Sequence, residues 1–402
     1  MQQTVSCCIS VPLSTGLYRY QVSRVVSSHA GVQLLRVLFA LMFMALPSLH
    51  AKAADAVSTP ATPPASAGTA TVRTEQITGT GGTFPAPVYA KWANTARSAI
   101  GVDVTYNAIG SGAGQDQIIS RSVDFGASDA PMDDARLSAA KLLQFPTVIG
   151  AVVVIVNLPR VREGELKLTG ETLAAIFAGK IGKWNDPRLK QVNPDVTLPN
   201  LPIEPIHRYE PSGTSFAFTS YLSAVSLEWK SSVGIGTKVN WPAGVGARGS
   251  DGVATAVNIT RGAIAYVEST YAAENHLTTA QLRNRSGVFV EPTTASFTAA
   301  AASADWNTPN FAVSLVDTDG AASWPIVTPT FVLLPKDPKD MTRSAAVMRF
   351  FDWAYKSGGA VAEQLDYVQL PATVQDSVRA AWRSQVSVDG RPVYKYGRPV
   401  YK

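Results

Sequence analysis

Three glycine-rich turns in this sequence carry hydroxyl side chains directly before a predicted helix. They lie at residues 79–84, 109–114 and 211–215. A helix N-terminus leaves four backbone N–H groups unpaired and carries about half a positive charge. Glycine lets an anion approach the backbone, and Ser or Thr adds a hydroxyl donor. Each turn alone is more simply a helix cap, but the three together favour a shared oxyanion site.

Two charged residues lie close to these turns. Arg208 comes four residues before Ser212, and its guanidinium could bind an oxyanion through two parallel hydrogen bonds. It could equally be a surface residue that pairs with Glu210. Asp129 is the second residue, and it is either an acceptor in the site or the cap of a helix that has Pro131 in its first turn.

The elements that must position these residues alternate between strands and helices. Short β-branched runs bounded by turn residues predict strands at 102–106, 149–157, 263–267 and 330–334. Apolar periodicity predicts helices at 87–97, 115–120, 170–177, 216–225, 344–355 and 373–382. This alternation predicts an α/β fold with largely buried sheets. The section 160–328 is richer in loops, and we expect it to form a second α/β lobe inserted in the first.

The composition excludes several classes of protein. The chain has 402 residues, of which 46% are hydrophobic and only 16% charged, so it can bury a core and does not have the composition of a nucleic-acid-binding protein. Four of the 35 basic residues and no acidic residue fall in the first 53, which leaves 31 basic and 30 acidic residues in the remainder. Both cysteines, Cys7 and Cys8, also lie there, so the remainder has no disulfide and no thiolate metal site.

The two ends of the chain are predicted to lie outside the fold. An apolar run at 37–46 and the sequence Ala51-Lys52-Ala53 predict a signal peptide over 1–53, cleaved after Ala53. Ten residues rise only ~15 Å, too little for a ~30 Å membrane core, although a retained anchor or a core helix is the alternative. Residues 54–75 predict a flexible linker, and the repeated GRPVYK at 390–402 predicts a solvated tail.

Five sequence blocks carry a family resemblance. They are GTFPAPVY (82–89), VDFGASDAP (123–131), QFPTVIG (144–150), SGTSF (212–216) and FFDWAY (350–355). From about residue 77 to 394 the chain resembles the periplasmic phosphate-binding proteins of Pst-type ABC transporters. The resemblance implies a two-lobe periplasmic binding protein fold (type II-like), with the ligand in a cleft between lobes joined by a hinge. Lobe one would comprise 76–157 plus 333–389, and lobe two 162–328, with crossings near 158–161 and 329–332.

The resemblance also implies a set of phosphate-binding residues. Asp129 would be the acceptor carboxylate, and Phe84 would contribute its backbone N–H. The donors would be completed by Thr83, Ser111, Arg208, Ser212, Gly213 and Thr214. The sequence departs from the family at Glu210, where an aspartate is common, at Pro211, where a glycine is common, and at Gly112, where a serine is common.

The resemblance implies high-affinity binding of inorganic phosphate in the periplasm and delivery to an ABC permease with its cytoplasmic ATPase, by a monomer without a cofactor. Phosphate keeps a proton at neutral pH and can donate a hydrogen bond to the Asp129 carboxylate, whereas sulfate has no proton to donate. Another tetrahedral oxyanion, such as arsenate, sulfate or molybdate, is the alternative ligand. A secreted phosphatase or other hydrolase is a weaker alternative, because only His207 and His276 follow residue 53 and no Gly-x-Ser-x-Gly motif surrounds Ser111 or Ser212. Two dispersed histidines fit no metal site, and the GxGxxG pattern at 244–249 follows Trp-Pro and predicts a loop.

Overall fold

The computed structural model describes residues 7–13, 16–22, 74–395 and 398–399. The chain divides into two compact units, residues 1–68 and 69–402. In the first, β1 (Cys7–Leu13) and β2 (Gly16–Val22) form an antiparallel hairpin. The predicted apolar run at 37–46, the cleavage after Ala53 and nearly all of the linker lie outside the described residues. No helix among the described residues is both long and apolar enough to cross a membrane.

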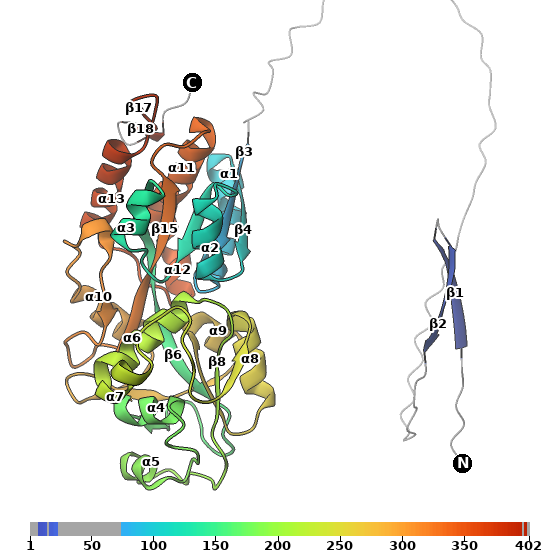
Figure 1. Cartoon of the computed structure of the whole chain (residues 1–402), viewed down its shortest axis with the longest axis vertical. Coiled ribbons are helices and arrows are strands. Elements are labelled where there is room, and N and C mark those ends of the chain that lie inside the picture. The colour runs from blue at the N-terminus through green and yellow to red at the C-terminus, as the bar shows by residue number, and fades with distance from the viewer. Residues whose placement is uncertain (1–6, 14–15, 23–73, 396–397, 400–402) are drawn as a thin grey trace, which may run out of the picture. The chain divides into compact units, whose positions relative to one another are not determined.

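The second unit is built on a mixed sheet of ten strands (Figure 1). Its main path runs in the order β4 (Val102–Ala108), β3 (Glu75–Gly81), β5 (Phe125–Ser128), β15 (Ile326–Pro335), β6 (Leu142–Val156), β10 (Ala263–Glu268), β8 (Glu204–Arg208) and β9 (Val245–Ala247). The strands at both ends of this path pair in parallel, and the central pairs β5–β15, β15–β6 and β6–β10 are antiparallel. Two short strands extend it, β11 (Thr278–Thr279) on β6 and β14 (Leu315–Val316) on β15.

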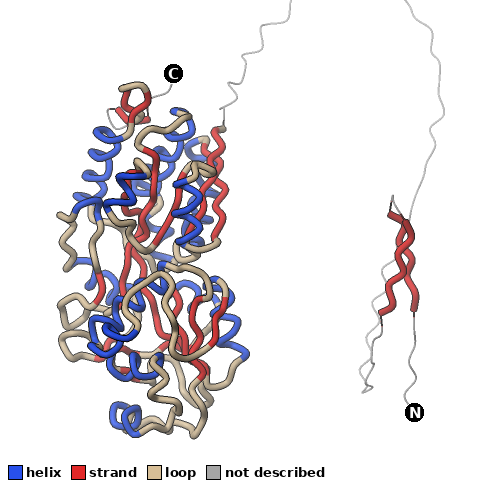
Figure 2. Tube along the Cα trace, in the orientation of Figure 1, coloured by secondary structure: helices blue, strands red, loops and turns tan. Residues whose placement is uncertain are grey.

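The long strands β6 and β15 connect two groups of elements (Figure 2). Residues 142–151 of β6 pair with β15, and residues 152–156 pair with β10. All 15 residues of β6 are buried, so its sequence is a nearly continuous apolar run instead of an alternating one. At ~3.3 Å per residue the strand spans about 50 Å, enough to serve both groups. The predicted strand at 149–157 is therefore confirmed, but it is only the second half of β6.

Helices cover both groups of strands, and every predicted helix is confirmed. The upper group in Figure 1 carries α1 (Ala86–Ile100), α2 (Ser111–Ile119), α3 (Asp134–Ala139), α11 (Met341–Ser357), α12 (Gly359–Gln364) and α13 (Ala372–Gln385). The lower group carries α4 (Gly170–Phe177), α5 (Pro187–Val192), α6 (Gly213–Val225), α7 (Leu227–Ser232), α8 (Gly249–Ile259) and α9 (Ser269–Glu274). The remaining elements are α10 (Thr294–Ala302), the 3-10 turn η1 (Pro309–Phe311), and the short strands β7 (Lys167–Leu168), β12 (Gln281–Arg283), β13 (Phe289–Val290), β16 (Ser387–Val388), β17 (Arg391–Pro392), β18 (Tyr394–Lys395) and β19 (Arg398–Pro399).

The predicted α/β class with a buried sheet is confirmed, whereas the predicted solvated tail is wrong in part. Val393 and Tyr394 are fully buried. The ring of Tyr394 packs 5.3 Å from that of Trp382 on α13, measured between centroids. Burying an aromatic ring against another is favourable, and this holds the first copy of the repeat on the fold. The boundaries of the two lobes stay a prediction.

Candidate functional site

The fold brings the three glycine-rich turns together at the ends of strands and the starts of helices. The Ser111 hydroxyl, at the first residue of α2, accepts a 3.1 Å hydrogen bond from the backbone N–H of Gly213 at the start of α6. The N–H of Gly112 donates to the carbonyl of Pro211 at 3.3 Å. The residue before α2, Gly110, has a φ of 109°, which disfavours any residue with a side chain. The start of α2 and the turn before α6, which are about a hundred residues apart in the sequence, therefore lie against each other.

Asp129 lies at the centre of this arrangement and is only 1% exposed. Its Oδ1 accepts a 2.6 Å hydrogen bond from Thr330, and its Oδ2 accepts one of 3.3 Å from Ser111. Burial raises the pKa of Asp129 to about 6, against the opposing effects of Thr330, of the Arg208 charge and of Ser111. It does not cap the next helix, because α3 is capped by Asp133. The alternative role that the sequence left open for Asp129 is thus excluded.

Arg208 is buried, which excludes its alternative as a surface ion pair. Its Nη1 donates to Thr214 Oγ1 at 3.3 Å and to Ser250 Oγ at 3.4 Å. Its Nε donates to Glu210 Oε1 at 2.8 Å, and Nη2 contacts the same oxygen. Glu210 also accepts from the N–H of Gly249 at 3.1 Å, so it joins the arginine to the first residue of α8. A charged pair with little solvent around it fixes the guanidinium orientation more firmly than an exposed pair would.

Three glycines allow the close contacts in this site. A Cβ at Gly82 would lie 2.6 Å from Asp129 Oδ2, and one at Gly213 would lie 2.5 Å from Asp129 Cβ. A Cβ at Gly112 would lie 2.7 Å from the Cβ of Pro211. Non-bonded carbons do not approach that closely, so the glycine at 112 and the proline at 211 are sterically matched. The two positions, at which the sequence departs from the family pattern, are therefore in direct contact.

Two buried residues of the site carry no role in the sequence-based prediction. Ser250, on the first turn of α8, is fully buried, and its Oγ lies 2.8 Å from Thr83 Oγ1. The prediction of a loop at 244–249 is wrong, because β9 occupies 245–247 and α8 begins at Gly249. The glycine and serine at this helix start are the same signal as in the other three turns. Thr330 had no local signal, because its partner Asp129 is 201 positions away.

The predicted site residues thus lie together. Hydrogen bonds join them in two networks: Thr83, Arg208 and Thr214 are linked through Ser250 or directly, and Asp129 and Gly213 are linked through Ser111. The two networks meet where Gly213 and Thr214 are neighbours in the chain. Ser212 is buried, and its Oγ caps α6 by accepting from Ser215 N–H at 3.3 Å. Phe84 follows Thr83, and its side chain is fully buried. The result is the Asp129 carboxylate and the Arg208 guanidinium, which is paired with Glu210, among hydroxyl and amide donors. This set suits a small oxyanion that still carries a proton.

His207, which precedes Arg208 in the sequence, contacts Trp241 and the backbone of Arg208 and forms no hydrogen bond with Ser111 or Ser212 among those of the described residues. The ring of His207 stacks on Trp241, with 4.8 Å between centroids, and its Nδ1 lies 3.1 Å from the Arg208 carbonyl. Burial lowers the pKa of His207. Within the described part of the chain, no group of three or more His, Cys, Asp or Glu residues could hold a metal ion.

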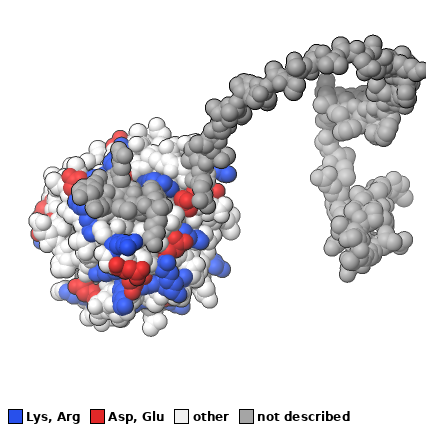
Figure 3. Space-filling model, turned by 90° about the horizontal axis from the view of Figure 1, so that it is seen from above, with Lys and Arg blue, Asp and Glu red and all other residues white. Residues whose placement is uncertain are grey.

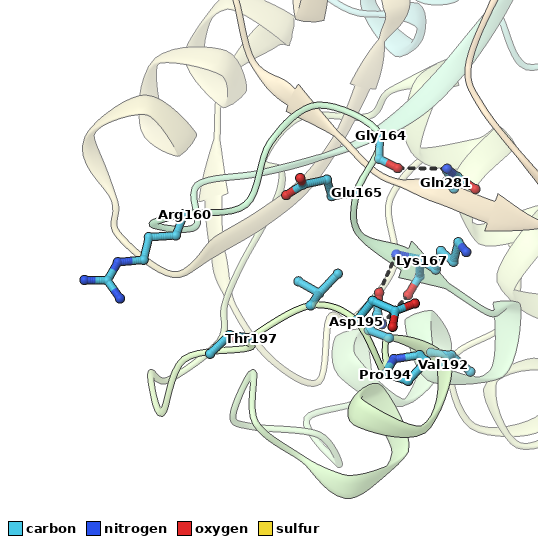
Figure 4. A pocket seen from close by; sticks show the side chains of 11 residues that line it. Arg160, Gly164, Glu165, Lys167, Val192, Pro194, Asp195, Thr197 and Gln281 are labelled. Atoms are coloured by element: carbon cyan, nitrogen blue, oxygen red, sulfur yellow. Dashed lines mark hydrogen bonds between the residues drawn. The ribbon is translucent and has the colours of Figure 1, made fainter.

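A groove of about 520 Å³ lies in another part of the second unit (Figure 4). The side chain of Asn193 holds the backbone of Lys167 through two hydrogen bonds of 2.8 Å, and Gln281 donates to the Gly164 carbonyl at 2.8 Å. Arg160 extends away from the other labelled side chains. These polar groups hold loops together, and none of the predicted site residues lines the groove.

The surface charge gives no competing site on the face shown in Figure 3. Lys and Arg side chains lie there among Asp and Glu side chains, with uncharged residues between them. Charges of both signs that are interspersed in this way do not produce the strong field that a basic stripe would. The candidate site is the buried cluster around Asp129, where the predicted site residues lie together.

Comparisons with known proteins agree on the family. The family described as the PBP superfamily domain matches residues 64–357. The chain is 46% identical over 327 residues to the phosphate-binding protein PstS of Pasteurella multocida, which covers 81% of this chain and 95% of that protein. It is 47% identical over 311 residues to PstS of Haemophilus influenzae, covering 77% of this chain and 93% of that protein.

A solved structure shares the fold. The phosphate-binding protein from Stenotrophomonas maltophilia superposes with a TM-score of 0.60 at 20% identity, and the match covers 81% of this chain and 99% of that chain. The architecture is that of a two-lobe periplasmic binding protein, in which β6 and β15 join the two groups of elements. The chain belongs to the PBP superfamily and, within it, to the PstS family of phosphate-binding proteins.

Proposed function

We propose that this protein binds inorganic phosphate with high affinity and delivers it to an ABC-type permease for import. The observation that carries the proposal is the buried Asp129 carboxylate, which lies among hydroxyl, amide and guanidinium donors. Its relatives with 46% and 47% identity are named phosphate-binding proteins, which supports the same ligand.

The chemistry of Asp129 favours phosphate over fully ionised anions. Phosphate keeps at least one proton at neutral pH, and an ionised Asp129 accepts a hydrogen bond from it. Sulfate has no proton to donate, so two negative charges would face each other in a site with little water. An unmatched buried charge costs several kcal/mol, or on the order of 10³-fold in affinity. The carboxylate thereby selects against sulfate as well as for phosphate.

The remaining residues supply the donors. In this proposal the Phe84 N–H and the Thr83 hydroxyl bind from the turn before α1, and Ser111 binds from the start of α2. Arg208 contributes its guanidinium. The turn at the start of α6 contributes Ser212, Gly213 and Thr214. Because α1 and α2 belong to one group of elements and α6 to the other, a ligand that contacts all of them favours the closed arrangement of the lobes.

The proposal extends to the setting of the protein. The lobes are 76–157 plus 333–389 and 162–328, and the chain works as an exported monomer in the periplasm. The permease binds the closed, phosphate-loaded form, and a cytoplasmic ATPase drives the transport. The protein binds and releases its ligand without converting it, so it is not an enzyme.

Native mass spectrometry and calorimetry test the proposed ligand. Protein that is purified gently is expected to carry one phosphate. After the phosphate is stripped, titration should give tight binding of phosphate and much weaker binding of sulfate and molybdate. Arsenate is protonated like phosphate and is expected to compete. Copurified sulfate, or equal affinity for sulfate and phosphate, would overturn the proposal.

A further inference from the structure

Three tyrosine hydroxyls hold three successive backbone carbonyls in the turn before α1. The turn consists of residues 82–84, and each of its carbonyls accepts a hydrogen bond from a different tyrosine. The bonds are Tyr106 to the Gly82 carbonyl at 2.8 Å, Tyr271 to the Thr83 carbonyl at 3.0 Å, and Tyr367 to the Phe84 carbonyl. These tyrosines lie on β4, on α9 and in the segment after α12. Parts of the chain that are far apart in sequence thus fix one short turn.

A hydrogen bond to a carbonyl also fixes the N–H of the same peptide unit. The unit is planar and trans, so its C=O and its N–H point in opposite directions. The carbonyl of Thr83 shares a unit with the N–H of Phe84, and the carbonyl of Gly82 shares one with the N–H of Thr83. Tyr106 therefore helps to fix where the N–H of Thr83 points, and Tyr271, together with the N–H of Ala86 that bonds the same carbonyl, does so for the N–H of Phe84. The carbonyl of Phe84 differs, because its unit ends at Pro85, which has no N–H.

The two N–H groups are available as donors. Among the residues that the structure describes, neither the N–H of Thr83 nor that of Phe84 donates to a protein acceptor. The Thr83 hydroxyl bonds to Ser250, which in turn contacts Arg208, so the turn borders the candidate site. Buried N–H groups are rarely left without a partner. This turn is thus well placed to donate to an anion.

The three hydroxyls act as donors at any physiological pH. Burial raises the pKa of Tyr106, Tyr271 and Tyr367 well above the usual value, so each keeps its proton. Tyr271 is 6% exposed and Tyr367 is 1% exposed. A carbonyl that accepts a hydrogen bond is polarised, and this strengthens the N–H of its own unit as a donor.

We propose that Tyr271 and Tyr106 are positioning residues for phosphate binding, because they orient and polarise the peptide units that present the N–H groups of Phe84 and Thr83. The inference rests on the proposed function and deepens it. Tyr271 lies on α9, in the group of elements that carries α6 and α8, whereas the turn belongs to the other group. The bond from Tyr271 to the Thr83 carbonyl therefore joins the two groups of elements. It orients the N–H of Phe84 in the arrangement in which the two groups are in contact.

Hydroxyl deletions test this role with a matched control. Tyr271→Phe keeps the ring and leaves the Thr83 carbonyl paired with the N–H of Ala86 at 3.2 Å, so the chain is expected to fold. Phosphate affinity should fall roughly three- to tenfold, the range of one hydrogen bond. Tyr106→Phe should give a similar loss. Tyr367→Phe removes the hydroxyl that bonds the Phe84–Pro85 peptide unit, which has no N–H to present. The phosphate affinity of this variant should stay within about twofold of wild type.

Amide NMR separates positioning from a general structural effect. In the wild type the amide proton of Phe84 should move downfield when phosphate binds. That movement should shrink in Tyr271→Phe and persist in Tyr367→Phe, with melting temperatures measured alongside. Unchanged phosphate affinity in Tyr271→Phe, or an equal loss in Tyr367→Phe, would overturn the inference while wild-type binding still supported the proposed function. Failure of the wild type to bind phosphate would overturn both.

Discussion

Thr330 donates a 2.6 Å hydrogen bond to the carboxylate of Asp129, and both side chains are buried. The two residues are 201 positions apart and meet because β15 lies beside β5 in the sheet. This bond favours the ionised form of Asp129 and lowers its pKa, whereas burial raises it. A strand on one side of the site thus helps to keep the carboxylate ionised, so that it can accept a hydrogen bond from phosphate.

Replacing Thr330 with valine should weaken phosphate binding. The valine has nearly the same shape but cannot donate, so Asp129 becomes harder to ionise. Affinity at pH 7 should fall roughly three- to tenfold, and the loss should be smaller at pH 8.5 than at pH 6.5. Thr328→Val is the matched control, because Thr328 lies on the same strand and donates to the backbone carbonyl of Asp129, at 3.1 Å. Equal losses in both variants at every pH would contradict this role.

Ser250 should matter although it lies outside the family pattern from which the site was predicted. Its hydroxyl links Thr83 with Arg208, and both are proposed donors. Ser250→Ala should weaken phosphate binding roughly two- to tenfold in calorimetry. Ser231→Ala, which removes an exposed hydroxyl on α7, should leave the affinity unchanged. An unaltered affinity in Ser250→Ala would remove α8 from the site.

The steric match between Gly112 and Pro211 predicts a strong coupling. Gly112→Ser places a Cβ about where Pro211 already lies, at 2.7 Å. Overpacking of this kind costs about 1–3 kcal/mol, so thermal denaturation should shift downward by several degrees. Adding Pro211→Gly to this variant should restore much of the melting temperature. Simple additivity of the two changes in a double-mutant cycle would show that the residues are independent.

Asp129 should make the ligand-free protein less stable as pH rises. Its pKa in the folded state is about 6, above the ordinary value of 3.8. A raised pKa contributes stability that is fully present below pH 3.8 and lost as pH rises through 6. Phosphate-free Asp129→Asn should therefore have a higher melting temperature than wild type at pH 8. At pH 4.5 the increase in melting temperature should be much smaller. A gain of the same size at both pH values would contradict the shifted pKa.

Much of the fold was predictable because its signals are local. The apolar periodicity that predicts α1 and α11, and the β-branched run in β6, depend on neighbouring residues. The glycine-rich turns were likewise visible, since a helix start needs the same residues whatever surrounds it. The burial of Tyr394 was not predictable, because it depends on a ring contributed by a distant helix.

The residues of the candidate site likewise divide into those with a local sequence signal and those that depend on contacts between distant segments. Residues in glycine-rich turns, such as Ser111 and Thr214, were found from the sequence and the family resemblance together. Thr330 and Tyr271 act through contacts between segments about 190 or more positions apart, and no local pattern marks them. Ser250 carries the local signal of a glycine and a serine at a helix start, but the three-residue strand before it is too short to give a pattern that distinguishes it from a loop.

The central claim is that the Asp129 carboxylate selects for a protonated anion, and calorimetry with phosphate and sulfate on wild type and Asp129→Asn tests it most directly. The wild type should bind phosphate and prefer it to sulfate by on the order of 10³-fold. In the variant that preference should fall further than the affinity for phosphate itself. A variant that loses phosphate binding but keeps the full preference over sulfate would contradict the account.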